Sequence, residues 1–108
     1  MTMSAEEWRH KEYPEGEVIC LIFIMLAKDK EKPTKANTSQ ATKILDELKK
    51  KGIKVLGFYW TLGRYDDVVI FEAPSAKDAM KLAISVKDYV SSETMVAIPR
   101  QEALKLIG

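Results

Sequence analysis

Residues 18–27 form an unbroken apolar run that is rich in β-branched and aromatic side chains. A short run of this composition between charged segments predicts a buried strand rather than a helix. Successive side chains of a strand point to opposite faces. One face would carry Ile19, Leu21, Phe23 and Met25, and the other would carry Val18, Cys20, Ile22, Ile24 and Leu26. Both faces of this strand therefore need a covering layer.

The chain has little material with which to cover both faces by itself. Its 108 residues are expected to form one domain, and a domain of this size buries a limited share of its surface. Leaving the large side chains of one face in water would forgo about 1.5–3 kcal/mol for each, in a domain whose whole stability is about 5–15 kcal/mol. We therefore expect a second copy of the chain to cover the open face. The alternative is that the chain's own termini cover it.

Helical and extended patterns alternate along the rest of the chain. Asn37 and Gln40 resemble a helix-capping arrangement, and the apolar residues that follow at helical spacing predict a helix that ends at Gly52. This helix would bury Ala41, Ile44, Leu45 and Leu48. Residues 53–62 and 68–71 are rich in strand formers and predict an antiparallel hairpin.

A second helix is predicted to start at Ser75, which can cap it together with Asp78. A strand over residues 94–98 and a short amphipathic helix over residues 100–107 complete the pattern. The inner face of the second helix is predicted to carry Ala76, Ala79, Met80, Ala83, Val86 and Val90.

The predicted order of elements is strand, helix, strand, strand, helix, strand. This is the order of the split β-α-β, ferredoxin-like fold, an α+β sandwich in which two helices cover one face of an antiparallel sheet. The expected domain spans residues 17–108, including the C-terminal helix, and residues 1–16 are expected to form a polar N-terminal arm. The face of the sheet opposite the helices is left for another layer.

The hairpin carries the most distinctive local pattern of the chain. Gly63, Tyr65 and Asp66 occupy its turn, and the surrounding segment resembles the GYD-domain family, small proteins named for a Gly-x-Tyr-Asp turn. The resemblance covers most of the chain beyond the arm. It implies a ferredoxin-like fold whose sheets pair into a dimeric α/β barrel. The biochemical role of the family is largely undefined, and this chain departs from its usual pattern in the long arm and in a lysine-rich loop after the first strand.

The turn residues have a structural interpretation and a functional one. Gly63 suits a positive φ angle, Asp66 can accept backbone N–H bonds, and Tyr65 can cover the end of the hairpin. Alternatively, Tyr65 and Asp66 line a ligand cleft between sheet and helices together with Tyr59 or Trp60. Strand alternation places Trp60 on one face with Phe58 and Leu62, and Tyr59 on the other with Thr61.

Composition argues against several classes of function. The 17 basic and 16 acidic residues leave a net charge of +1, which creates no strong field for nucleic acid or anionic lipid. Residues 66–72 also lack the basic and aromatic signature of RNA-binding domains that share this fold. The apolar run is too short to cross a bilayer and no cleavage site follows it. We expect a cytoplasmic protein with no nucleic-acid or membrane partner.

The chain is poor in the residues that hold metals and carry out nucleophilic catalysis. His10 is its only histidine and Cys20 its only cysteine, so neither a His/Cys zinc site nor a Cys–His pair is expected. No glycine-rich phosphate loop occurs. No cofactor and no catalytic residue are therefore predicted.

Three functional hypotheses follow. The first is a non-enzymatic homo-oligomeric domain that binds a small aromatic or apolar ligand between sheet and helices. The second is an enzyme of the cofactor-independent monooxygenase or isomerase kind, as in other dimeric α/β barrels, and it rests on analogy of fold. The third is a module whose charged arm and loop dock on another protein.

Overall fold

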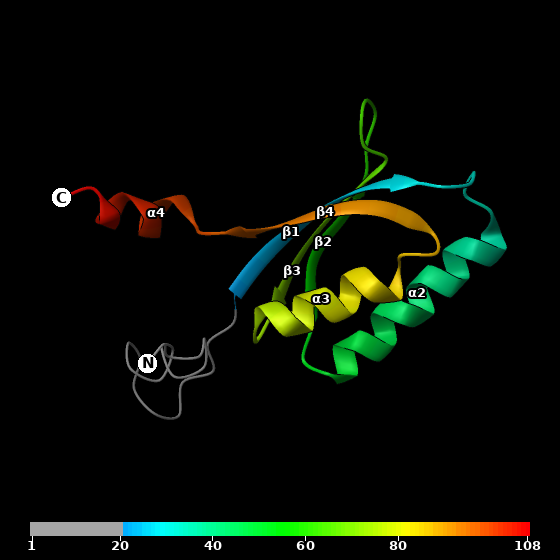
Figure 1. Cartoon of the computed structure of the whole chain (residues 1–108), viewed down its shortest axis with the longest axis horizontal. Coiled ribbons are helices and arrows are strands. Elements are labelled where there is room, and N and C mark those ends of the chain that lie inside the picture. The colour runs from blue at the N-terminus through cyan, green and yellow to red at the C-terminus, as the bar shows by residue number, and fades with distance from the viewer. Residues whose placement is uncertain (1–20) are drawn as a thin grey trace.

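Four antiparallel strands form one sheet, and two helices lie on the same side of it (Figure 1). The computed structural model describes residues 21–108. The order of strands in the sheet is β2-β3-β1-β4. The elements are β1 (Leu21–Asp29), α2 (Lys35–Lys50), β2 (Lys54–Trp60), β3 (Asp67–Ala73), α3 (Ala76–Ser85), β4 (Val90–Ala97), α4 (Arg100–Ala103) and the 3-10 turn η1 (Leu104–Leu106). The predicted α+β, ferredoxin-like fold is confirmed. The predicted arm over residues 1–16, with His10, and also Cys20 lie outside the described residues.

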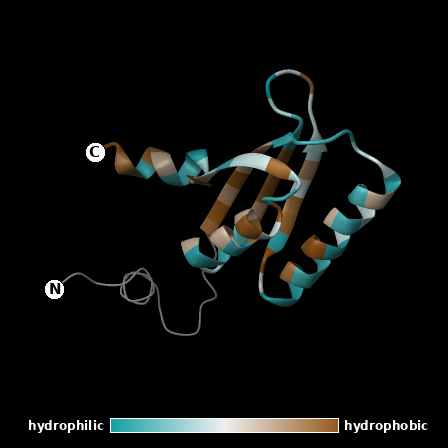
Figure 2. Cartoon of the chain, turned by 45° about the vertical axis from the view of Figure 1, so that its right-hand side comes forward, coloured by the Kyte–Doolittle hydropathy of each residue, from teal (hydrophilic) through white to brown (hydrophobic). Residues whose placement is uncertain are grey.

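The core lies between the sheet and the two helices. Phe23 of β1 and Phe71 of β3 pair directly across the sheet, and their rings stack with centroids 5.4 Å apart. Figure 2 shows hydrophobic residues concentrated along the strands and hydrophilic residues along much of the helices. The buried cluster consists of Phe23, Met25, Leu48, Ile53, Val69, Phe71, Ala73, Ala79 and Leu82.

The first helix begins earlier than the sequence predicted. Thr34, not Asn37, is its N-cap residue. The Thr34 hydroxyl accepts the N–H of Asn37 at 3.1 Å, and the Asn37 side chain accepts the N–H of Thr34 at 2.7 Å. Asparagine at the third helical position thus completes a reciprocal capping box, a role usually filled by glutamate or glutamine. The helix includes the first residues after the proline-containing loop.

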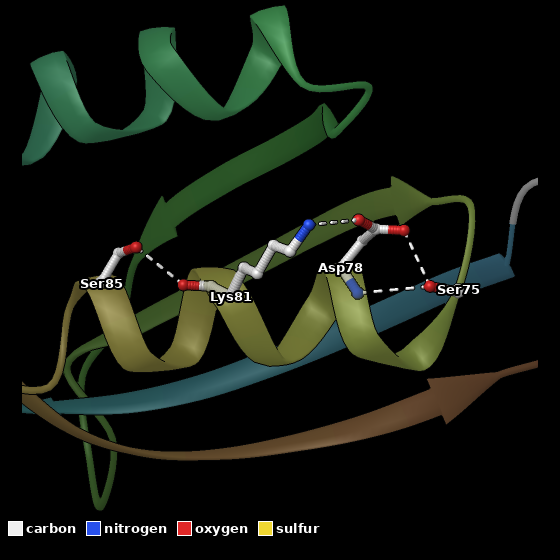
Figure 3. Close-up of polar contacts among 4 residues, drawn as sticks. All are labelled: Ser75, Asp78, Lys81 and Ser85. Atoms are coloured by element: carbon white, nitrogen blue, oxygen red, sulfur yellow. Dashed lines mark hydrogen bonds and ion pairs between the residues drawn. The ribbon is translucent and has the colours of Figure 1, made fainter.

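The second helix starts as predicted and ends earlier. Ser75 caps α3, since its hydroxyl accepts the N–H of Asp78 at 3.3 Å and donates to the Asp78 carboxylate at 2.7 Å (Figure 3). The helix ends at Ser85, and Val90 is the first residue of β4. The prediction that Met80 faces inward is wrong, because Met80 is 63% exposed while Leu82 is buried.

The opposite face of the sheet has no helix over it among the described residues (Figure 1). Ile22, Ile24 and Leu26 of β1 are half-buried there, between the side chains of neighbouring strands. The C-terminal segment α4–η1 extends away from the sheet (Figure 1), and its apolar residues Leu104 and Leu106 are exposed. The C-terminal helix therefore does not supply the missing layer. Within residues 21–108, no helix has the length and apolar character needed to cross a membrane.

Candidate functional site

A cavity of about 290 Å³ lies between the sheet and the helices, near the end of β1. Its floor comes from Met25 and Ala27 of β1 and Val69 of β3. The first turns of α2 form one wall, and Leu82 of α3 and Val86 lie on the opposite side. Leu48, near the C-terminal end of α2, is buried, whereas Ile44 and Leu45 are half-buried and pack against the core cluster.

Three aromatic rings line the cavity. Phe58 and Trp60 are two residues apart on β2 and therefore share the face of the sheet that looks toward the helices. Tyr89 comes from the turn between α3 and β4. Trp60 is 66% exposed, which places it at the mouth of the cavity rather than in its depth. The rings give the cavity a largely apolar surface with one open side.

A carboxyl pair lies at the same end of the cavity. Asp67, the first residue of β3, is opposite Ala27 of β1, so Asp29 follows two residues later on the same face of the sheet. Asp67 is only 7% exposed. Its burial, the hydrogen bond with Asp29 and the negative charges of Asp29 and Asp66 raise the pKa of Asp67 to about 7. Asp67 therefore keeps its proton at a pH where an ordinary aspartate has lost it.

The Gly-x-Tyr-Asp turn lies directly beside this pair. Gly63 has a φ of 107°, a left-handed conformation that favours glycine. The backbone N–H of Asp29 donates to Oδ2 of Asp66 at 2.7 Å. The Thr61 hydroxyl donates to the carbonyl oxygen of Tyr65 at 2.7 Å and closes the turn. Asp66 thus fastens the turn to the end of β1.

Tyr65 reaches away from the cavity. Its hydroxyl donates to Oε2 of Glu93 on β4 at 2.8 Å, and the Arg64 guanidinium lies 5.5 Å from the centre of its ring. The hydrogen bond with Glu93 is the main reason that the pKa of Tyr65 is raised above the ordinary tyrosine value. Tyr65 lines a separate, shallow hollow of about 270 Å³ with Lys28, Ser91 and neighbouring residues.

The structure does not bring the four candidate residues into one cleft. Trp60 lines the cavity, and Asp66 supports it from outside through Asp29. Tyr59 lies on the opposite face of the sheet, where its ring covers Gly57 so closely that a Cβ there would be 2.8 Å from Cε2. Tyr65 lies in the second hollow.

Sequence reasoning missed Asp29, Asp67 and Tyr89. The two aspartates stand in strongly charged or polar surroundings, and charged segments of this kind usually face solvent. The two carboxyl groups come together through the antiparallel pairing of residues 21–27 with 67–73, which places Asp29 two residues beyond the partner of Asp67. Strand alternation did place Phe58 beside Trp60.

The acidic end of the cavity can attract a positive charge, and Asp67 can exchange a proton near neutral pH. Among residues 21–108 no set of three or more histidine, cysteine, aspartate or glutamate side chains is placed to hold a metal ion. The groups that line the cavity are carboxyl groups, aromatic rings, an apolar floor and the polar side chains of the first turns of α2.

Comparisons with known proteins bear on the family and the fold. The model of a family described as "GYD domain" matches residues 20–107. The fold is similar to that of a feast or famine regulatory protein from M. tuberculosis, solved in complex with L-methionine. That match has a TM-score of 0.55 and 14% sequence identity, and it covers 87% of this chain and 68% of the other. The search of curated proteins found no match.

Proposed function

The chain belongs to the GYD domain family, and we propose that it acts as an oligomeric, non-enzymatic domain that binds a small aromatic or apolar ligand. The observation that carries this proposal is the cavity between sheet and helices, with Phe58, Trp60 and Tyr89 in its lining. Ligand sites are typically concave, mostly apolar and equipped with a few polar groups. A cytoplasmic location is part of the proposal.

The size of the cavity suits a small molecule. Its volume of about 290 Å³ is roughly twice the ~150 Å³ of an engineered protein cavity that binds benzene. A molecule with one or two rings therefore fits it. The similar fold of a regulatory protein complexed with L-methionine supports small-molecule binding as a role for this architecture, although the fold alone does not specify a ligand.

The uncovered face of the sheet supports the oligomeric part of the proposal. Across all four strands this face presents apolar side chains, and those on the edge strands are well exposed. It carries Ile22, Ile24, Leu26, Tyr59, Val68, Ile70 and Met95. Contiguous exposed apolar surface of this kind typically marks an interaction site. Packing this face against the same face of a second copy would bury both in one symmetric interface.

A cofactor-independent enzyme is a second candidate, and one observation favours it. Asp67 lines the cavity with a pKa of about 7, which suits a general base at neutral pH. Tyr65 lies in the other hollow, outside the cavity. The enzyme candidate therefore rests on Asp67 alone.

Titration of the ¹⁵N-labelled full chain with indole tests ligand binding. Amide shifts should concentrate in β2, the first turns of α2 and the turn at Tyr89, and Trp60→Leu should weaken binding. Shifts confined to the open face of the sheet, or none at millimolar indole, would contradict the proposal. Turnover of a bound compound that is lost in Asp67→Asn would instead favour the enzyme candidate.

Light scattering after size exclusion at micromolar concentration tests the oligomer. A mass of twice 12.2 kDa or more is expected. A monomer at every concentration would remove the oligomeric part of the proposal without affecting the cavity.

A further inference from the structure

We propose that the ligand of the cavity is a small organic cation, an amine with an aromatic or apolar body, whose positive group binds at the Asp29–Asp67 carboxyl pair. This inference rests on the proposed ligand-binding function and adds the charge of the ligand to it. Four observations carry it: the sign of the charges around the cavity, the buried state of Asp67, the aromatic lining, and the lack of a metal-binding cluster among residues 21–108.

The charged side chains that line the cavity are all acidic. Besides the pair, Glu31 and Asp88 contribute carboxylates at its rim, and no lysine or arginine of residues 21–108 is part of the lining. Two lysines flank Asp29. Lys28 lines the second hollow, and the ammonium group of Lys30 donates to the carbonyl oxygen of Lys87 at 2.8 Å. Lys30 is thus engaged with the backbone of the turn rather than with the carboxyl pair. In a chain of nearly balanced charge, the cavity carries a local negative field.

Asp67 is buried, and no basic side chain of residues 21–108 pairs with it. It is 7% exposed and lines the cavity. Among the described residues, no ammonium, guanidinium or amide group donates to its carboxyl group, and the group it contacts is the carboxyl of Asp29. Buried carboxylates in proteins are normally paired with a cation or accept several hydrogen bonds. A cation in the cavity would supply such a partner and replace the proton on Asp67.

The aromatic side chains fit the same ligand. Trp60 stands opposite Asp67 in the register of β2 and β3, so a ring and a carboxyl group adjoin each other at one end of the cavity. Tyr89 contributes a second ring. Ammonium groups bind favourably over aromatic rings, best over tryptophan, and an opposite charge within a few ångströms favours the charged form of the amine.

A metal ion fits the cavity less well than an amine. Hard divalent cations take six or more oxygen ligands, whereas no described cluster of three or more suitable side chains exists. Most of the lining is apolar or aromatic, and such a lining contacts the body of an organic molecule rather than a hydrated ion. The occupant that matches both parts of the cavity is amphiphilic and positively charged.

Three probes of one shape and different charge test the inference: phenethylamine, 2-phenylethanol and phenylacetate. Calorimetry with the full chain at pH 8 should show the amine binding at least about tenfold more tightly than the alcohol, as expected for a hydrogen bond to a charged group. Phenylacetate should bind most weakly of the three. Equal affinity for amine and alcohol would overturn the inference.

Variants locate the charge recognition. Asp67→Asn and Asp29→Asn should each abolish the preference for amine over alcohol while leaving the affinity for the alcohol within about twofold. The matched control is Glu72→Gln, which removes a carboxyl group from the opposite face of β3 and should leave the preference intact. Retained binding of 2-phenylethanol shows that each variant is folded. A preference for the amine that survives in both aspartate variants would overturn the inference.

The outcomes separate this inference from the proposed function. If 2-phenylethanol binds as well as phenethylamine, the cavity is a ligand site without charge selectivity. If none of the three probes produces heat or amide shifts around the cavity, the ligand-binding function itself fails. If Mg²⁺ or Mn²⁺ binds at the pair and the amine does not compete with it, the site is a metal site and the inference is wrong.

Discussion

The backbone N–H of Asp29 donates a 2.7 Å hydrogen bond to Oδ2 of Asp66. Asp66 belongs to the Gly-x-Tyr-Asp turn, and Asp29 is the last residue of β1, with its own carboxyl group beside Asp67. The turn that characterises the family therefore holds in place the strand end that presents a carboxyl group to the cavity. Asp66 is a positioning residue for the cavity even though it is not part of its lining.

Replacing Asp66 with alanine tests this link. The Asp66→Ala variant leaves the partly buried N–H of Asp29 without its acceptor, which should lower the free energy of unfolding by about 1–2 kcal/mol. Asp66→Asn keeps one side-chain oxygen and should cost clearly less. Urea denaturation of both variants and the wild type measures the difference. Equal stability of all three proteins would show that the hydrogen bond contributes nothing.

Stability should depend on pH through Asp67. The pKa of its carboxyl group is raised from 3.8 to about 7 in the folded protein. Between about pH 4 and pH 7 the folded state therefore keeps a proton that the unfolded state has released. The contribution of this group to the free energy of unfolding falls as pH rises through that window and is constant above it.

The Asp67→Asn variant isolates this contribution. Because the cavity is open to solvent on one side, we expect the variant to gain about 1–2 kcal/mol relative to wild type between pH 4 and pH 8, less than the full linkage value. Chemical denaturation at several pH values measures the gain. Glu72→Gln is the control. A stability difference between Asp67→Asn and wild type that does not change with pH would mean that Asp67 has an ordinary pKa.

The hydrogen bond between Tyr65 and Glu93 predicts a spectroscopic change. Since this bond is the main cause that raises the pKa of Tyr65, Glu93→Gln should make the Tyr65 phenol ionise at lower pH than in the wild type. The ¹³Cζ signal of Tyr65, assigned by its loss in Tyr65→Phe, follows the titration. An unchanged midpoint in Glu93→Gln would show that the contact is absent in solution.

Two methionine substitutions test the proposed sheet-to-sheet interface. Met95 of β4 pairs with Ile24 on the open face and is 44% exposed, so Met95→Lys should keep the fold and reduce the mass in light scattering to that of a monomer. Met80→Lys is the matched control, because Met80 is also well exposed but lies on α3. Loss of assembly in Met80→Lys alone would move the interface to the helical side.

The sequence predicted the elements of this fold well because their signals are local. The apolar run, the Ser75 cap of the second helix and the Gly63 turn each act over a few residues. The start of the first helix was misplaced because Asn37 can serve either as an N-cap or, as here, as the third residue of a capping box that begins at Thr34. Met80 was misplaced because the inner face of α3 is set by Ala79 and Leu82. Each residue of a helix is rotated by about 100° from the one before it, so Met80, next to Ala79, points toward solvent.

The cavity was harder to predict because it depends on distances between segments far apart in the chain. Asp29 and Asp67 meet only through the register of β1 and β3, which a single sequence does not reveal. Tyr65 was grouped with Trp60 because both are aromatic and close in sequence. The turn between them sends Trp60 to the cavity and Tyr65 across the sheet to Glu93.

The carboxyl groups and the aromatic rings that the sheet contributes to the cavity come from different strands. Asp29 and Asp67 belong to the inner strands β1 and β3, which are bonded on both sides, whereas Phe58 and Trp60 belong to the outermost strand β2. Substitutions at the margin of a sheet disturb fewer neighbours than substitutions in its middle. We therefore expect that substitutions at Phe58 or Trp60 change the shape of the cavity with less effect on the sheet than substitutions at Asp67.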